Sequence, residues 1–223
     1  MTDSPLPAGF RGPVKLFPLP NLVLFPNVDQ GLHVFEPRYR QMTADALDSD
    51  GHIAIVLLKD GWEETYDHHP EIEEVACLGR IVRHEQLPDG RYNLRLRGLT
   101  RVRLLEEVPS DKKYRTAQVA ALPEVPADDP APLRQALADT VLARFEADGA
   151  AHQQLRELFR GGVPLGQLCD VLSYALPVPL GVKQGLLAEP RIAVRVAALI
   201  HALGSTPNPN LPPRPFPPSF SPN

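Results

Sequence analysis

Residues 16–40 read LFPLPNLVLFPNVDQGLHVFEPRYR, and this stretch decides how the first half of the chain folds. Its proline-bounded apolar runs predict short extended segments at 15–19 and 22–25. Such runs are typical of edge strands, because proline cannot donate to a strand ladder. Glu36-Pro37 then predicts a helix start, since proline is favoured at the first helical position. One side of this helix, expected to end near Asp48, carries Tyr39, Met42, Ala46 and Leu47.

The next hundred residues predict further strands. The apolar run 52–58 has the length of a buried strand. Leu87-Pro88-Asp89-Gly90 is a turn sequence that joins 76–86 to 92–97 as a hairpin, because proline sets φ at the first corner and glycine takes the left-handed position. After Gly98, segments 101–106 and 114–122 extend the meander. Many short strands with one inserted helix predict a small antiparallel β-barrel, closed or nearly closed.

The composition changes at residues 123–132, PEVPADDPAP, which predicts a domain boundary. Asp129-Pro130 predicts a helix start, and apolar spacing predicts a helical bundle from there to about residue 204. The fold class is therefore expected to be α+β. We expect a disordered N-terminus at 1–13, the barrel at 14–123, the bundle at 124–204 and a proline-rich disordered tail at 205–223.

Composition limits the classes of protein to be considered. The 223 residues have a formal net charge of −4, which argues against a surface built throughout for nucleic acid or anionic membrane. The two cysteines, Cys77 and Cys169, are far apart, which suggests core thiols in a reducing compartment. No signal peptide and no apolar run of membrane-spanning length is apparent. We expect a cytoplasmic protein with no membrane partner.

Three segments of the chain form a recognisable set: LFPLPNLVLFP with LHVFEPRYRQM, then GRIVRHEQLPDGRYNLRLRGLTRVRLLE, and finally LCDVLSYALPVPLGVKQGLLAEPRIAVRVAALI. Together they resemble the N-terminal substrate-recognition domain of Lon-type ATP-dependent proteases. They occur in the family's order and span residues 14–203. The resemblance implies a PUA-like barrel followed by helices. It also implies a recognition domain standing alone, without the ATPase and protease domains.

Catalytic motifs are not recognisable in the sequence. No G-x-x-x-x-G-K-[ST] phosphate loop occurs, and no lysine lies in a context resembling the Lon protease domain. Cys77 and His84 are seven residues apart on an expected strand, so they should lie on opposite faces and not form a nucleophile–base pair. His68 and His69 lie in an acidic stretch that we interpret as a solvated loop and not as a metal site. We expect no enzyme activity, no cofactor and no metal.

The resemblance implies binding of unfolded or tagged polypeptides, as an adaptor or a holdase, with a separate ATP-dependent protease as a further partner. The residues expected to share the polypeptide-binding surface are Asn21, Phe25, Phe35, Arg38 and Tyr39. The proline-rich tail could bind an SH3-like partner, although a disordered end is the default interpretation.

An alternative hypothesis is RNA binding, because PUA-like barrels include RNA binders. Strand alternation places five arginines on one face of the expected sheet: Arg91, Arg95, Arg97, Arg101 and Arg103. No aromatic stacking platform alternates with them, as single-stranded RNA binding usually requires. We therefore favour a charged solvent-exposed face over a nucleic-acid site.

Overall fold

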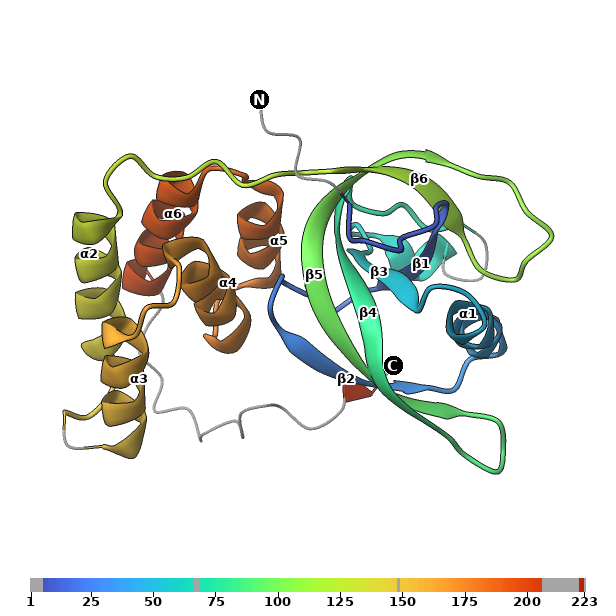
Figure 1. Cartoon of the computed structure of the whole chain (residues 1–223), viewed down its shortest axis with the longest axis horizontal. Helices are drawn as coiled ribbons and strands as arrows, with labels where there is room; N and C mark the ends of the chain where they lie inside the picture. Colours follow the sequence, from blue (N-terminus) through green and yellow to red (C-terminus); the bar gives the residue numbers. More distant parts are fainter. Residues whose placement is uncertain (1–5, 66–68, 148, 206–220, 223) are drawn as a thin grey trace. The chain divides into compact units, whose positions relative to one another are not determined.

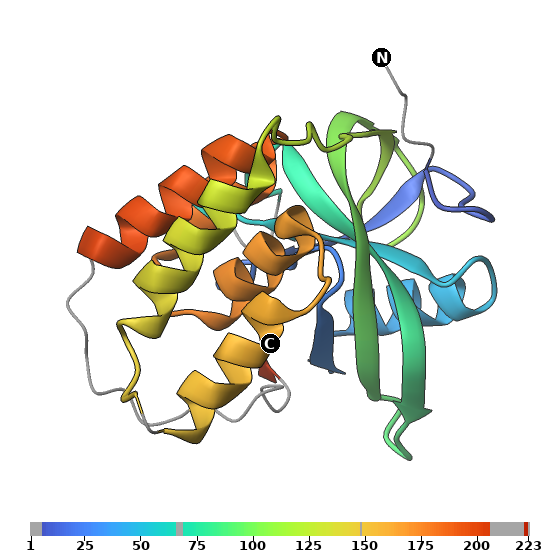
Figure 2. The same cartoon turned by 60° about the vertical axis from the view of Figure 1, so that its left-hand side comes forward.

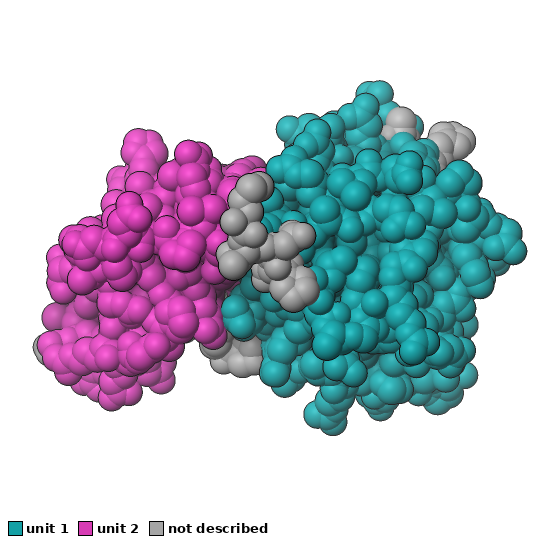
Figure 3. Space-filling model, turned by 45° about the horizontal axis from the view of Figure 1, so that its top comes forward, with its two compact units in different colours: residues 1–123, 214–223 teal, residues 124–213 magenta. Residues whose placement is uncertain are grey.

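The computed structural model describes residues 6–65, 69–147, 149–205 and 221–222. The chain forms two compact units, residues 1–123 with 214–223 and residues 124–213 (Figure 3). The tail expected to be disordered lies almost entirely outside the described residues.

The first unit is a sheet with one inserted α-helix (Figure 1). Its strands are β1 (Val14–Leu19), β2 (Asp29–Val34), β3 (His52–Leu57), β4 (Val75–Gln86), β5 (Tyr92–Glu107), β6 (Thr116–Ala121) and β7 (Ser221–Pro222). The hydrogen-bonded order is β4-β3-β1-β6-β5-β2-β7, and β4 also pairs with β5. The pairings of β4, β3, β1, β6 and β5 therefore form a ring, from which β2 and then β7 extend.

The α+β class is confirmed, but the sheet is mixed and not purely antiparallel. β1 and β3 pair in parallel, from Lys15 opposite Ile53 to Leu19 opposite Leu57. A parallel pair needs a crossover connection, and the segment between these strands contains β2 and the helix α1 (Pro37–Leu47). This crossover is why a meander of antiparallel hairpins does not describe the whole sheet.

The helix α1 and the long hairpin form as the sequence predicts. Pro37 occupies the first turn of α1, and Tyr39, Met42 and Ala46 are buried. The Tyr39 ring lies 4.4 Å from the Phe17 ring of β1. β4 and β5 are joined by the predicted turn, in which Gly90 has a φ of 81° (Figure 2).

The strand prediction for residues 22–34 is wrong. Residues 22–25 form no strand, and residues 29–34, for which no strand was predicted, form β2. The chain turns between them, where Asn27 adopts a φ of 63° that asparagine tolerates better than most residues. The predicted break after Gly98 is also absent, because β5 continues from Tyr92 to Glu107.

Three extra residues interrupt the strand pairing. Val82 is inserted in β4 opposite β5, Leu99 in β5 opposite β4, and Leu105 in β5 opposite β6. An extra residue in one strand changes which face its later side chains point to. Beyond Leu99, the adjacent residues Arg101 and Val102 are both buried, at 1% and 0% exposed, so buried and exposed side chains do not simply alternate there.

The second unit consists of five helices in the residues that the structure describes. They are α2 (Pro130–Leu142), α3 (Ala150–Arg160), α4 (Leu165–Ala175), α5 (Leu180–Ala188) and α6 (Ile192–Ser205). The predicted start of α2 is confirmed, since the Asp129 side chain accepts a hydrogen bond from the backbone N–H of Ala131. The most buried charged group of this unit is Arg195 of α6, which is 0% exposed.

Candidate functional site

The surface at the C-terminal end of β2 is the best candidate for a binding site. Phe35 follows β2 directly and is 40% exposed, one of few large apolar side chains so exposed in the described chain. The His33 ring stacks near it, with ring centroids 6.2 Å apart. Arg38, at the start of α1, lies three residues after Phe35. We call Phe35, His33 and Arg38 the β2-end surface.

Hydrogen bonds fix the His33 ring. Its Nδ1 donates to Oδ1 of Asn93 on β5 at 2.8 Å, and its Nε2 lies 3.3 Å from Nη1 of Arg91. The donor Arg91 requires an unprotonated acceptor at Nε2, so the neutral tautomer with a proton on Nδ1 satisfies both contacts. The exposed Phe35 ring therefore rests on a ring with a defined orientation.

Arg38 is positioned by its neighbours in the sequence. Its guanidinium pairs with the Glu36 carboxylate at 2.9 Å and lies 4.7 Å from the centre of the Tyr39 ring. Planar guanidinium groups favour both kinds of contact. The β2-end surface thus combines an exposed aromatic ring with an arginine whose charge is already balanced by Glu36, a combination suited to an apolar segment.

The five residues predicted for polypeptide binding are not all on one surface. Phe35, Arg38 and Asn21 reach solvent, whereas Phe25 is 0% exposed and Tyr39 is 4% exposed. The Tyr39 hydroxyl donates to the carbonyl of Pro18, which ties α1 to β1. Phe25 and Tyr39 are therefore core residues, and a role in direct contact is not supported for them.

The arginine face is smaller and less positive than predicted. Arg101 is buried and is not part of the exposed face, whereas Arg103, two residues further on, is exposed. Three of the others pair with carboxylates: Arg91 with Asp89 at 2.6 Å, Arg97 with Asp29 at 2.7 Å and Arg103 with Glu74 at 3.6 Å. Arg97, first by its hydrogen bond, holds the pKa of Asp29 below its usual value. Arginines neutralised in this way attract phosphates weakly.

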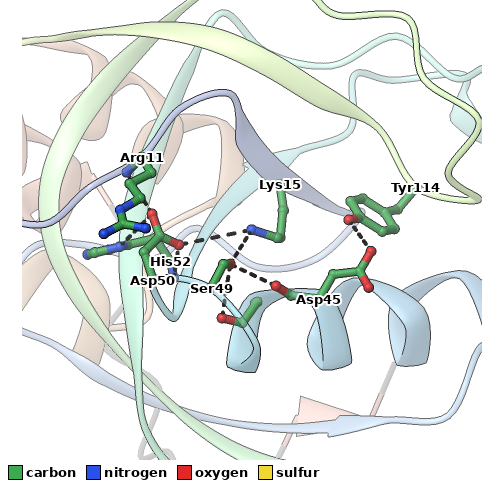
Figure 4. A network of polar contacts seen from close by, with 8 residues as sticks. Arg11, Lys15, Asp45, Ser49, Asp50, His52 and Tyr114 are labelled. Carbon is green, nitrogen blue, oxygen red and sulfur yellow. Dashed lines mark hydrogen bonds and ion pairs between the residues drawn. The ribbon is translucent and has the colours of Figure 1, made fainter.

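A polar network joins α1 to β1 and β3 (Figure 4). Nζ of Lys15 donates to the Ser49 hydroxyl at 3.0 Å and lies 4.0 Å from the Asp50 carboxylate. Ser49 itself donates to the Asp45 carbonyl at 2.7 Å. In this arrangement the Ser49 hydroxyl accepts from Lys15, and its own proton is already donated to the backbone. Lys15 and Ser49 therefore have the geometry of a structural hydrogen bond between β1 and the end of α1, and not that of a nucleophile with its base.

Two aspartates of this network have pKa values below the usual 3.8. The hydrogen bond from the Tyr114 hydroxyl, at 2.6 Å, lowers the pKa of Asp45 against the effect of burial. Burial raises the pKa of Asp50, but backbone N–H donors of Arg11 and His52 and the nearby Lys15 outweigh it. Both carboxylates are therefore stabilised in their charged form.

This network predicts a loss of stability in acid. Above pH 3.8 both aspartates are charged whether the chain is folded or not, so their full contribution is present. As the pH falls below that value, the unfolded chain binds protons first and the contribution is lost. Urea unfolding at about pH 7, 5 and 3 should show little change between the first two and a drop at the third.

Tyr114→Phe provides the matched test, because it removes the largest cause of the lowered Asp45 pKa. It should make the drop in acid smaller. Tyr174→Phe is the control, since burial and not a carboxylate raises the pKa of Tyr174, to about 12. An identical acid profile in all three proteins would contradict the assignment.

The remaining chemical candidates do not assemble into a site. Cys77 is buried and a free thiol, as is Cys169, while His84 is exposed. His68 lies outside the described residues, and His69 pairs with Glu107 at 3.3 Å. Within residues 6–65, 69–147, 149–205 and 221–222, no group of three or more His, Cys, Asp and Glu side chains is placed to hold a metal ion. In the same ranges, no helix has the length and apolar character needed to cross a membrane.

The sequence was compared with family models. Residues 13–205 match the model of the ATP-dependent protease La (LON) substrate-binding domain. The chain belongs to this family. The predicted resemblance is therefore confirmed, and as a Lon substrate-binding domain the chain is a substrate-recognition module.

Solved structures agree with this assignment. A Lon N-terminal domain protein from Xanthomonas campestris is 26% identical, with a TM-score of 0.61 over 87% of this chain and 98% of that one. The N-terminal domain of Mycobacterium avium complex Lon protease shares the fold, with a TM-score of 0.69 at 16% identity over 86% of this chain and 98% of that one.

Curated relatives are much longer proteins. Lon protease of Rhizobium meliloti is 24% identical over 88% of this chain but only 24% of its own length. Lon protease 2 of Syntrophobacter fumaroxidans is 29% identical over 52% of this chain and 14% of its own length. The chain therefore spans about a quarter or less of the relatives that it matches.

Proposed function

We propose that this Lon substrate-binding domain is a non-catalytic module that binds unfolded or tagged polypeptides through the β2-end surface. It acts as an adaptor for a separate ATP-dependent protease or as a holdase. Family membership supports the class of ligand, and the exposed Phe35 supports the place. The two buried free thiols, Cys77 and Cys169, support action in a reducing cytoplasm.

The physical basis is burial of apolar substrate surface. An exposed aromatic ring held by a neighbouring ring is preorganised, so its burial gains roughly 25 cal/mol per Å² with little ordering cost. A surface this small supports weak, rapidly reversible binding. Such binding suits a module that must release its substrate.

The test is fluorescence anisotropy of a labelled, permanently unfolded polypeptide at low and high salt, with an RNA oligonucleotide in parallel. Apolar contacts should persist at high salt, whereas phosphate contacts should weaken steeply. Salt-resistant polypeptide binding without RNA binding would support the proposal. Salt-sensitive RNA binding with no polypeptide binding would refute it.

Phe35→Ala should weaken polypeptide binding by about fivefold to tenfold, because a central aromatic contact is lost. The free energy of unfolding should change by less than about 1 kcal/mol, since the ring is 40% exposed. Leu105→Ala is the matched control, because Leu105 is 61% exposed and lies on β5 outside the β2-end surface. Equal binding by both variants would place the site elsewhere.

A further inference from the structure

The outer edge of β2 is only partly paired within the residues that the structure describes. On one side, all six residues of β2 pair with β5, from Asp29 opposite Arg97 to Val34 opposite Tyr92. On the other side, the described pairing covers only Leu32 and His33. An exposed edge presents a row of backbone donors and acceptors that another extended chain can pair with.

The sequence of β2, DQGLHV, carries no residue that would block pairing at this edge. It contains neither proline nor lysine, which commonly protect edge strands. Gly31 in its middle has no side chain, and a glycine inside a strand often lies where another backbone approaches closely. The outward side chains are held back toward β5, Asp29 by Arg97 and His33 by Asn93.

The structure contains an occupant of this edge. Ser221 and Pro222, which form β7, pair with Leu32 and His33 in parallel (Figure 1). Of the two residues of β7 only Ser221 has a backbone N–H to donate, because proline cannot donate to a ladder. Parallel pairing directs the C-terminal end of an occupant toward Phe35, where β2 ends.

We propose that the outer edge of β2 is a strand-addition site for an extended polypeptide segment running parallel to β2, and that the chain's own C-terminal segment is its resident occupant. The inference that this C-terminal segment competes with a polypeptide substrate rests on the proposed function. The pairing of β7 with β2 does not depend on it. Backbone pairing explains affinity without a sequence requirement, and Phe35 adds an apolar contact at the end of the strand. A tethered segment competes at an effective concentration of about millimolar, so a substrate must displace it.

The test locks the segment in place. His33→Cys with Pro222→Cys puts two thiols at paired positions of β2 and β7, while both native cysteines are buried. Asp29→Cys with Pro222→Cys is the control pair, because Asp29 is four residues away, about 13 Å along the strand. We expect an intramolecular disulfide in the first pair and not in the second. Amide exchange of residues 29–34 should be slower in the oxidised protein than in the reduced one.

Polypeptide binding then separates the two proposals. The oxidised first pair should bind the unfolded polypeptide at least about tenfold more weakly than the same protein after reduction. Equal disulfide formation in both pairs, or equal binding before and after reduction, would overturn the strand-addition site. The disulfide and the slow exchange could also appear while neither the oxidised nor the reduced protein binds the polypeptide. In that case the pairing of the C-terminal segment with β2 stands, whereas the proposed function and the competition both fail.

Discussion

Asp170→Ala should lower the free energy of unfolding of the second unit by about 3–5 kcal/mol, a large part of a typical domain's stability. Asp170 of α4 is 1% exposed and accepts a hydrogen bond from Nη1 of Arg195 at 2.8 Å. Arg195 is fully buried, and its second partner is the Glu124 carboxylate. Without Asp170, the buried guanidinium of Arg195 keeps only the Glu124 carboxylate as an ion-pair partner among the described residues. Breaking a buried ion pair by removing one partner is strongly destabilising, because the remaining charge stays buried and is less well compensated.

Urea unfolding followed by helical circular dichroism would measure this effect. Asp128→Ala is the matched control, because Asp128 is exposed and should change stability by less than about 0.5 kcal/mol. The double variant Asp170→Leu with Arg195→Met should be more stable than Asp170→Ala alone, since it removes both charges. If Asp170→Ala unfolds like Asp128→Ala, Asp170 does not compensate the charge of Arg195.

Gly98→Ala should destabilise the first unit by about 3 kcal/mol, the upper end of the usual cost of overpacking. A Cβ added to Gly98 would lie 2.0 Å from the carbonyl oxygen of Phe25 and 3.1 Å from Sγ of Cys77. The backbone N–H of Gly98 also donates to Val28 at 2.8 Å, so neither chain can move away freely. The substitution must therefore displace the turn that leads into β2.

The control for Gly98→Ala is Gly185→Ala in α5. A Cβ there meets nothing within 4 Å, and alanine is favoured over glycine inside a helix. Gly185→Ala should raise the free energy of unfolding by roughly 0.5–1 kcal/mol, measured by the same urea titration. A Gly98→Ala protein as stable as the parent would show that Phe25 and β5 are not held together as the structure describes.

Phe35 is exposed and Arg38 is half-buried, and both lie beside Glu36-Pro37, whose helix-start signal is formed by adjacent residues. Their role in polypeptide binding stays a prediction. Phe25 and Tyr39 were predicted for the polypeptide-binding surface but are buried. The sequence did not reveal this, because an aromatic residue in a family motif is compatible with both core and surface. Whether such an aromatic residue lies in the core or at the surface depends on the residues packed against it, as Phe17 packs against Tyr39.

The arginine face illustrates a different limit. Period-two alternation predicts that Arg97, Arg101 and Arg103 share a face, and it holds for Arg95 and Arg97. The pairing of β5 with β4 is irregular at Leu99, and beyond it Arg101 and Val102 are both buried while Arg103 is exposed. An insertion of this kind is defined by two strands together, so neither strand's own sequence reveals it.

The sequence alone determined the elements that depend on neighbouring residues. Proline and glycine positions predicted the start of α1, the start of α2 and the β4–β5 turn, and the ordered motifs identified the family. Tertiary structure alone decided the parallel β1–β3 pair, the burial of Arg101, the Arg195–Asp170 contact and the pairing of β7 with β2. The physical reason is range: turn and helix preferences arise within a few residues, whereas register, edge pairing and burial depend on which distant segment lies opposite.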